Sequence, residues 1–481
     1  MRVKEQGTML TLLLLALAAG LFAATAGAAP VAITDPKDRQ IVDAFLKQTE
    51  QVPKQLSAEA CKRLADEDSE ATEAYTWRVM PYLRMTLTAY ELTQDAHYLD
   101  LFVQSFDNMR AALTKGPDGY LGWYGKVDPD YGDPKDPDYK LDAVISSFSV
   151  AQGVGAFVCL IDAKPELREK YAQQRRDYLD LVENQLIKKH DVRGDYVDLG
   201  KGGAIYRTPA VGLKPDSARL TLPHNKHSIV IRGFLSLYRA TGKDEYLQRA
   251  VKLGTRFKHS LVLKGDHYEW NYWDPAGEWD VHVEGQGGAD ASVRLEASAS
   301  PHETTVRRWK HWMGVEHRGG YYSSSVSQAV ALYQFGLVFD ATDLPRFLRT
   351  QLEMCWNRDE EHPVWSRVDG TRDEQYTQGA YIADALAPYC DTVASFLYTG
   401  KRQDQRLEKA NDDWDGGPVA NGWVRGKFLD LPAVQTTAQR YWQVGRKFLD
   451  KQANKGFVAA LKFDVTPPGY RPPTTPDQMK P

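Results

Sequence analysis

The stretch "LYRATGKDEYLQRAVKLGTRF", residues 237–257, indicates the fold class of this chain. Its first residues end an amphipathic helix, and Thr241, Gly242 and Lys243 form a turn. A second helix then follows, because apolar residues recur with the spacing of one helix face. These residues are Tyr246, Leu247, Ala250, Leu253 and Phe257. The stretch therefore predicts a helical hairpin.

The same pattern of helix, short turn and helix recurs at irregular spacing. Further copies begin at Ala89, Cys159, Val338 and Phe396. With an N-terminal helix expected over residues 41–63 and a final helix over residues 434–452, they predict an all-α chain of about six or seven helical hairpins. In a closed ring each hairpin would cover its neighbour's apolar face, whereas an open solenoid would leave two ends that need caps.

Composition divides the chain into three segments. Residues 1–28 combine Arg2 and Lys4 with an apolar run over residues 9–24 and a small-residue end, which predicts a signal peptide and a secreted or periplasmic protein. Residues 29–465 are expected to form one catalytic domain, and we expect no membrane anchor. Residues 466–481 form a Pro-rich tail to which we assign no catalytic role.

The charge balance argues against a nucleic-acid or membrane partner. The chain has 60 basic and 64 acidic side chains, for a formal net charge of -4. Such a balance does not predict a strongly charged binding surface. The oligomeric state stays open at this stage.

The four cysteines have no metal-binding spacing. Both a disulfide between Cys355 and Cys390 and buried free thiols are compatible with the sequence. The chain has no phosphate-binding glycine loop and no HExxH motif. The Asp-rich loop over residues 128–140 is expected to be a rim loop, with a calcium site left open.

The segment "HYEWNYWDPAGEWDVHVEG", residues 267–285, interrupts the helical pattern. Its flanks alternate with period two around a turn at residues 274–277, which predicts a small β-hairpin insertion. One face should pack on the protein, and it consists of Tyr268, Trp270, Tyr272, Trp279, Val281 and Val283. In the predicted register Glu269 lies opposite His282, where the carboxylate would orient the imidazole. Asn271 and Asp280 share this polar face.

Aromatic and hydrogen-bonding side chains cluster at the predicted starts of successive helices. A sugar-binding cleft needs this combination, because aromatic rings stack on pyranose faces while fixed polar groups bind hydroxyls. Any single aromatic residue at such a place can instead pack a loop on the core. The candidate substrate-binding residues are Tyr75, Trp77, Arg78, His224, His227, Asn271, Trp273, His317, Tyr376 and Tyr381.

The segment "WKHWMGVEHRGGYYSSS", residues 309–325, supplies candidate acid–base groups. A tyrosine beside arginine and histidine can have its phenol pKa lowered enough to act as a base and then as an acid. These groups suit β-elimination on uronic-acid polymers, which also needs a residue that neutralises the C6 carboxylate. The reaction requires no metal and no cofactor.

The hairpin pattern over residues 40–455 resembles the (α/α) toroids of secreted carbohydrate-active enzymes, and the polar residues resemble those of alginate and glucuronan lyases on that fold. This resemblance implies an acidic polysaccharide as substrate. It assigns carboxylate neutralisation to Asn225, the catalytic histidine to His282 paired with Glu269, proton transfer to Tyr322 or else Tyr321, and a supporting role to Arg318. Departures in spacing leave His224, His227 and His317 as replacements.

Other functions remain open for the same residues. A glycoside hydrolase needs two opposed carboxylates, which Asp142, Glu269, Asp280, Glu316 or Asp384 could supply. A uronosyl C5-epimerase would share the lyase residues. A non-catalytic glycan-binding protein would use the aromatic residues alone.

Overall fold

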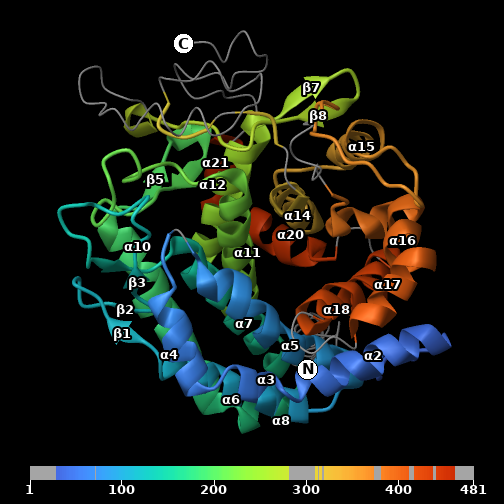
Figure 1. The fold of residues 1–481 in the computed structure, drawn as a ribbon. Coiled ribbons are helices and arrows are strands. Elements are labelled where there is room, and N and C mark those ends of the chain that lie inside the picture. The colour runs from blue at the N-terminus through green and yellow to red at the C-terminus, as the bar shows by residue number, and fades with distance from the viewer. Residues whose placement is uncertain are drawn as a thin grey trace, which may run out of the picture.

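Helices make up most of the computed structural model, which confirms the all-α prediction (Figure 1). The structure describes residues 29–70, 72–280, 309–312, 314–316, 319–372, 381–410, 416–436 and 440–460. The predicted signal peptide, residues 1–28, and the Pro-rich tail, residues 466–481, lie outside the described residues.

The helical hairpin predicted over residues 237–257 is confirmed. Helix α11 (His224–Thr241) ends at Gly242, which has a left-handed φ of 71°, and α12 (Asp244–Ser260) follows. The Gly242 N–H donates to the Tyr238 carbonyl oxygen at 2.7 Å, which closes the last turn. The apolar stripe of α12 is buried as its spacing predicts.

The other copies form helix pairs with one exception. The pairs are α5 (Met80–Thr93) with α6 (His97–Arg110), α7 (Val144–Asp162) with α8 (Pro165–Lys170), and α16 (Asp391–Tyr398) with α17 (Gly400–Ala410). The copy from Val338 contains a single helix, α15 (Asp343–Arg349), because the preceding α14 (Gly319–Gln334) ends before it.

Both terminal helices are shorter than predicted. The helix expected over residues 41–63 is split into α2 (Pro36–Thr49), α3 (Val52–Gln55) and α4 (Ala58–Asp66). Pro53 lies in the first turn of α3, where its fixed φ suits a helix start, and the Ser57 hydroxyl caps α4. The helix expected over residues 434–452 is split between α19 (Leu431–Thr436) and α20 (Trp442–Asp450), and α21 (Gln452–Ala460) follows.

Short elements connect these helices. They are η1 (Tyr75–Val79), α9 (Ala172–Leu181), η2 (Val182–Ile187), α10 (Lys188–Arg193), η3 (Gly200–Gly202), η4 (Glu278–Asp280), η6 (Thr350–Cys355), η7 (Asp384–Tyr389), α18 (Gly416–Arg425) and η8 (Gly426–Asp430). The strand pairs are β1 (Thr114–Lys115) with β2 (Leu121–Gly122), β3 (Gly125–Lys126) with β4 (Lys140–Leu141), β5 (Tyr196–Asp198) with β6 (Ala204–Tyr206), and β7 (Val262–Lys264) with β8 (His267–Glu269), all antiparallel.

Helices α7 and α11 make the most extensive contact in the core. Glycines allow their close approach, since a Cβ added to Gly155 would lie 2.6 Å from Ser236 Oγ and one added to Gly233 would lie 2.8 Å from the Phe148 carbonyl oxygen. Within the described part of the chain, α7 alone has the length and apolar composition to cross a bilayer. In the structure 78% of its apolar window is buried, as in a core helix of a folded domain.

Neighbouring helices contact one another in chain order, and the first described helix, α2, contacts α17 and α18 from the later part of the chain. Helix α5 contacts α7, α7 contacts α11, α11 contacts α14, α14 contacts η7, and α18 contacts α5. Helix α2 lies beside α17 and α18 (Figure 1). Ion pairs join the segments, with Lys427 Nζ 2.7 Å from Asp38 Oδ1 and Arg425 2.5 Å from Glu91.

The β-hairpin predicted around residues 274–277 is wrong. Strand β8 pairs with the preceding β7, Asn271 pairs with Val315, and residues 278–280 form η4 rather than a second strand. The reason is Asp280, whose carboxylate accepts hydrogen bonds from the Thr221 N–H and hydroxyl and from the Ala276 N–H. Of the predicted apolar face, Tyr268 and Trp270 are buried and Tyr272 and Trp279 are half-buried, but Asn271 and Asp280 of the predicted polar face are also buried.

All four cysteines are free thiols in the structure. Cys61 and Cys355 are buried, while Cys159 and Cys390 are half-buried. The disulfide considered between Cys355 and Cys390 is therefore not formed, and the alternative of free thiols holds.

Candidate functional site

The starts of η1, α7, α11 and α14 are joined by polar contacts. Glu70 Oε1 accepts a hydrogen bond of 2.9 Å from the N–H of Val144, the first residue of α7. Lys226, in the first turn of α11, places its Nζ 2.5 Å from Glu73 Oε1, just before η1. We call the residues at these starts, together with the segment 271–274 that packs on them, the helix-start cluster.

A histidine–aspartate pair lies at the first residue of α11. His224 Nε2 is 3.0 Å from Asp274 Oδ2, and the Asn271 amide donates to the other carboxylate oxygen at 3.0 Å. All three residues are buried. Burial opposes ionisation of Asp274, but the hydrogen bond and charge of His224 outweigh it and lower the pKa of Asp274. The carboxylate therefore stays ionised and fixes the imidazole.

Asn225 follows His224 and is also buried. Its side-chain Oδ1 accepts no hydrogen bond from any residue that the structure describes. The Ser324 hydroxyl of α14 donates to the Asn225 carbonyl oxygen at 3.3 Å, so the first turn of α11 touches the second turn of α14. A buried amide oxygen without a partner is costly, and it leaves Asn225 Oδ1 able to accept a hydrogen bond from a donor group such as a sugar hydroxyl.

The two adjacent tyrosines of α14 face different surroundings. Tyr321 is half-buried, and its ring lies 5.2 Å from that of Tyr272, whose carbonyl oxygen accepts from the His224 N–H at 3.4 Å. Tyr322 is fully buried and stacks on Trp270 at 5.7 Å. Burial raises the pKa of Tyr322 well above its usual value, which disfavours the predicted role of Tyr322 as the base. Tyr321 is the tyrosine at the helix-start cluster.

Two aromatic residues predicted to bind substrate are core residues. The Tyr75 hydroxyl donates to the Cys61 carbonyl oxygen at 2.8 Å, and the ring is fully buried. Trp273 is also fully buried, and its indole N–H donates to the Thr221 carbonyl oxygen at 2.6 Å. Both side chains close loops over the core, which is the alternative that the sequence left open for single aromatic residues.

His227 is a structural residue rather than a ligand-binding one. Its Nε2 accepts a hydrogen bond of 2.9 Å from the Tyr206 N–H, and the side chain is buried. Burial, with the charges of His224 and Arg256, lowers the pKa of His227 to about 3. The imidazole is therefore neutral at physiological pH, and its buried bond to the Tyr206 N–H disfavours the predicted substrate-binding role.

Trp77, Arg78 and Tyr381 are exposed, as a substrate-contacting surface requires. Trp77 is 46% exposed, and its indole N–H donates to Glu73 Oε2 at 2.9 Å. Tyr381 is 42% exposed and lies against Gly319 at the start of α14, while Arg78 forms an ion pair with Glu67. Glu269 Oε1 lies 3.2 Å from His267 Nε2, and its predicted partner His282 lies outside the described residues.

Four predicted site residues lie outside the described residues. They are His282, His317, Arg318 and Tyr376.

Sequence reasoning missed three members of the cluster. Glu70 and Glu73 lie in a charged stretch typical of a solvated loop, and Lys226 was passed over between Asn225 and His227. Burial and the charge of Glu73 raise the pKa of Glu70 to about 7, against the lowering effect of Lys226. The sequence signal that could have identified Lys226 is its place in the polar segment at the start of the core helix α11.

The carboxylates considered for a hydrolase mostly have structural partners. Asp142 is buried against Lys189 and Arg193, and despite burial these cations lower its pKa to about 2. Asp280 caps the loop described above, and burial raises its pKa. Glu316 is buried with the Ser325 hydroxyl 3.3 Å away, and Asp384 is exposed.

A second histidine–aspartate arrangement lies deeper in the protein. His190 Nδ1 is 2.9 Å from Asp195 Oδ2, and its Nε2 is 3.2 Å from Ser147 Oγ. Such a series suits nucleophilic catalysis only if substrate can reach the serine. Hydrogen bonds of these residues join α10 to α7, and burial lowers the pKa of His190.

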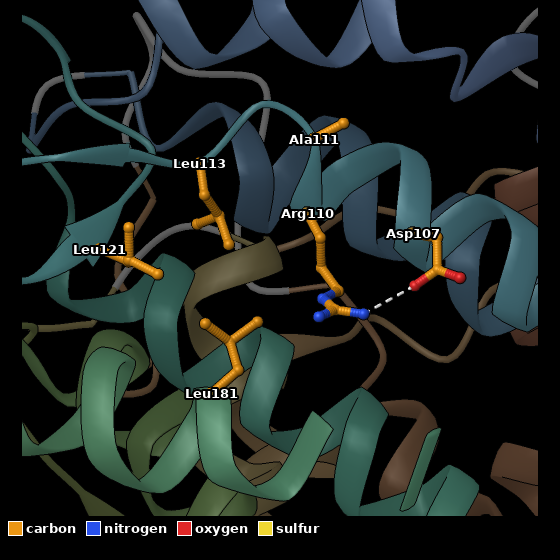
Figure 2. A pocket seen from close by; sticks show the side chains of 6 residues that line it. All are labelled: Asp107, Arg110, Ala111, Leu113, Leu121 and Leu181. Carbon is orange, nitrogen blue, oxygen red and sulfur yellow. Dashed lines mark hydrogen bonds and ion pairs between the residues drawn. The ribbon is translucent and has the colours of Figure 1, made fainter. Parts of the chain in front are cut away.

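A pocket of about 480 Å³ lies away from these residues, where the end of α6 meets β2 and α9 (Figure 2). It is lined by Asp107, Arg110, Ala111, Leu113, Leu121 and Leu181. Arg110 is held by Asp107 at 3.0 Å. None of the predicted site residues lines this pocket.

Carboxylates of the loop over residues 128–140 bind backbone groups. Asp128 Oδ1 accepts from the Asp130 N–H at 2.8 Å, and Asp133 Oδ1 accepts from the Lys135 N–H at 2.9 Å. Within the described ranges, no group of three or more His, Cys, Asp or Glu side chains is placed to hold a metal ion.

The assignment of a function depends on the geometry of the helix-start cluster alone. No protein-family model, no curated protein and no solved structure matches the chain.

Proposed function

We propose that this protein is a polysaccharide lyase that cleaves a uronic-acid polymer of the alginate or glucuronan type by β-elimination. One observation carries the proposal: the adjacent residues His224 and Asn225 lie together with Tyr321, which is distant in sequence, at the starts of α11 and α14. The sequence predicted Tyr321 as the alternative proton-transfer residue, Asn225 as the group that binds the substrate carboxylate, and His224 as a substrate-binding residue that could replace the catalytic histidine.

The proposed scaffold is a closed (α/α) toroid. Contacts that pass from α5 through α7, α11 and α14 to η7, with α18 returning to α5, support a ring of helices. The joined starts of η1, α7, α11 and α14 would then form one mouth of that ring. Side chains on loops at such a mouth can differ without a change in the core, and catalytic and binding residues are therefore common there.

In the proposed reaction Asn225 donates amide hydrogen bonds to the C6 carboxylate, which makes the C5 proton more acidic. The Tyr321 oxygen removes that proton, the C4–C5 double bond forms, and the C4–O4 bond breaks. Tyr321 then returns the proton to O4 of the departing sugar. His224, fixed by Asp274, takes the histidine role first assigned to His282.

A panel of polymers tests the proposal. The purified protein is incubated with alginate, glucuronan, glycosaminoglycans and pectin, and near-ultraviolet absorbance is followed. A lyase produces absorbance from the 4,5-unsaturated end together with new reducing ends. An epimerase produces neither signal but changes the uronosyl composition, and a binding protein leaves the polymer unchanged. Absence of unsaturated product from every uronate polymer refutes the lyase assignment.

Hydrolysis of glycosidic bonds is the second candidate function, favoured by Glu70. A general acid must hold its proton near neutral pH, and burial, with the charge of Glu73, raises the pKa of Glu70 to about 7. The two carboxyl groups lie around one ammonium, because Lys226 Nζ is 3.9 Å from Glu70 Oε2 and 2.5 Å from Glu73 Oε1. New reducing ends without unsaturated product, abolished in Glu70→Gln, would support this function over the lyase.

A further inference from the structure

We propose that Arg84 of α5 and Arg232 of α11 form a binding site for a carboxylate, between α5, α7 and α11 and deeper along these helices than the helix-start cluster. Two sources could supply the carboxylate, a uronic-acid unit of the proposed polymer or a small free carboxylate. The first source rests on the proposed lyase function, whereas the site itself does not.

Arg84 is half-buried and is bound by a neutral oxygen rather than by a carboxylate of the described residues. Its Nη2 donates to Ser149 Oγ of α7 at 2.8 Å, and its Nε is buried without an acceptor in the described part of the chain. A buried guanidinium N–H that makes no hydrogen bond is costly, so Arg84 has donor capacity left for a ligand.

Arg232 has a similar environment on α11. It is half-buried, and the acceptor that the described residues provide is the Ser228 carbonyl oxygen, 3.4 Å from Arg232 Nε. Arg425 of α18, by contrast, has an ionised partner, because it lies 2.5 Å from Glu91. A charge that is withdrawn from water is normally paired, so two half-buried guanidiniums on neutral oxygens indicate that an anion from outside the described chain completes the site.

Helix α7 brings the two arginines together. Ser149, which binds Arg84, directly follows Phe148, and the Phe148 carbonyl oxygen lies 2.8 Å from the position of a Cβ added to Gly233. Gly233 directly follows Arg232. The same turn of α7 therefore contacts the Arg84 guanidinium on one side and the backbone beside Arg232 on the other.

Repulsion between these cations favours the binding of an anion. Burial lowers the pKa of Arg84, and the charges of Arg232 and Arg425 lower it further, to about 9, so Arg84 is still a cation at neutral pH. Burial also lowers the pKa of Arg232, against the raising effect of Asp384, whose carboxylate accepts from the Ser323 hydroxyl near the start of α14. A carboxylate between the two guanidiniums would relieve the repulsion through charge-assisted hydrogen bonds.

The site is continuous with the residue proposed to bind the substrate carboxylate. Asn225 and Arg232 are seven residues apart, or about two helical turns, so they lie on one face of α11 with Arg232 about 10 Å further along the helix. Ser228 lies between them, and its buried hydroxyl has no partner among the described residues. A guanidinium matches the planar shape of a carboxylate, so polar groups that suit a uronate extend from the helix-start cluster to Arg232.

Direct binding tests the site without turnover. Isothermal titration calorimetry measures the binding of D-glucuronate, acetate and D-glucose to the wild type, Arg84→Gln, Arg232→Gln and the double variant. We expect each single change to weaken carboxylate binding by about 10-fold or more and the double change to abolish it, because each removes one charge-assisted pair. Uncharged D-glucose should show no binding that depends on the two arginines. Arg168→Gln, which removes an exposed arginine paired with Asp162, is the matched control and should bind as the wild type does.

The carboxylate arms distinguish the two sources. Tighter binding of D-glucuronate than of acetate assigns the site to a uronic-acid unit, and equal binding assigns it to small free carboxylates; both results support the site. Carboxylate binding that is absent from the wild type, or unchanged in a folded double variant, overturns the proposal. These measurements need no polymer cleavage, so the site can fail while the lyase assignment stands, and the reverse also holds.

Stability provides the second readout. Without a ligand, Arg84→Gln should leave the urea unfolding midpoint unchanged or raise it, because glutamine removes the repulsion and keeps a donor for Ser149 Oγ. D-glucuronate should raise the midpoint of the wild type but not of the double variant, since a ligand of the folded state stabilises that state. Arg84→Met and Arg232→Met replace any glutamine variant that does not fold. Lower midpoints in both single variants without ligand would make the arginines structural and would overturn the proposal.

Discussion

Acidification should destabilise this protein through His227. Burial lowers its pKa to about 3 in the folded state, whereas an unfolded histidine titrates near 6.5. The unfolded chain therefore binds a proton that the folded chain does not. The part of the unfolding free energy that depends on a neutral His227 is fully present above about pH 6.5 and is lost as the pH falls toward 3. At about 1.36 kcal/mol per pH unit, the fall from pH 6.5 to 5 costs about 2 kcal/mol, and the full range would cost about 5 kcal/mol.

The assay compares urea unfolding of the wild type and His227→Gln at pH 7.5 and 5. Glutamine retains an acceptor for the Tyr206 N–H but does not titrate. The variant should be less stable at pH 7.5 but should lose about 2 kcal/mol less than the wild type between the two pH values. The control is His97→Gln, which removes an exposed histidine paired with Glu50 and leaves His227 in place. This variant should still show the loss of unfolding free energy that His227 causes between pH 7.5 and 5. Equal pH-dependent losses in wild type and His227→Gln would refute the reasoning.

Three further predictions follow from single contacts. Gly155→Ala places a Cβ 2.6 Å from a serine oxygen on α11, so it should lower the free energy of unfolding by about 1–3 kcal/mol in urea titrations. Gly242→Ala meets no neighbouring atom, so it should lower the free energy of unfolding only through the strain of its left-handed φ. Asp274→Asn should lower kcat roughly 10- to 100-fold while the circular dichroism spectrum is kept, because His224 loses its ionised partner; unchanged turnover would exclude the pair from catalysis. Burial raises the pKa of the Cys61 thiol to about 12, so a maleimide at pH 8 should label it only after unfolding, and rapid labelling of the native protein would contradict its burial.

Local sequence signals predicted the helical hairpins well. Gly242 ends α11 and the apolar stripe of α12 is buried because both features depend on residues within a few turns of helix. The prediction of the β-hairpin was wrong because this segment depends on a contact that is distant in sequence. Asp280 binds Thr221, 59 residues earlier in the chain, and no period-two pattern contains that contact.

The site was predicted in part for similar reasons. His224 and Asn225 could be identified because polar residues that open an apolar helix are conspicuous in a sequence. The choice between Tyr321 and Tyr322 could not be made, since residues adjacent on a helix point about 100° apart and only the packing of Trp270 decides which one is buried. The contact of Lys226 with Glu73 depends on the docking of two helices that are distant in sequence.

The most direct test of the account is the separate replacement of the two tyrosines by phenylalanine, with production of unsaturated ends measured on a cleaved polymer. We predict that Tyr321→Phe lowers the initial rate by about 100-fold or more without loss of folding, and that Tyr322→Phe retains activity within a few-fold. Full activity in Tyr321→Phe would contradict the assignment of proton transfer to the helix-start cluster.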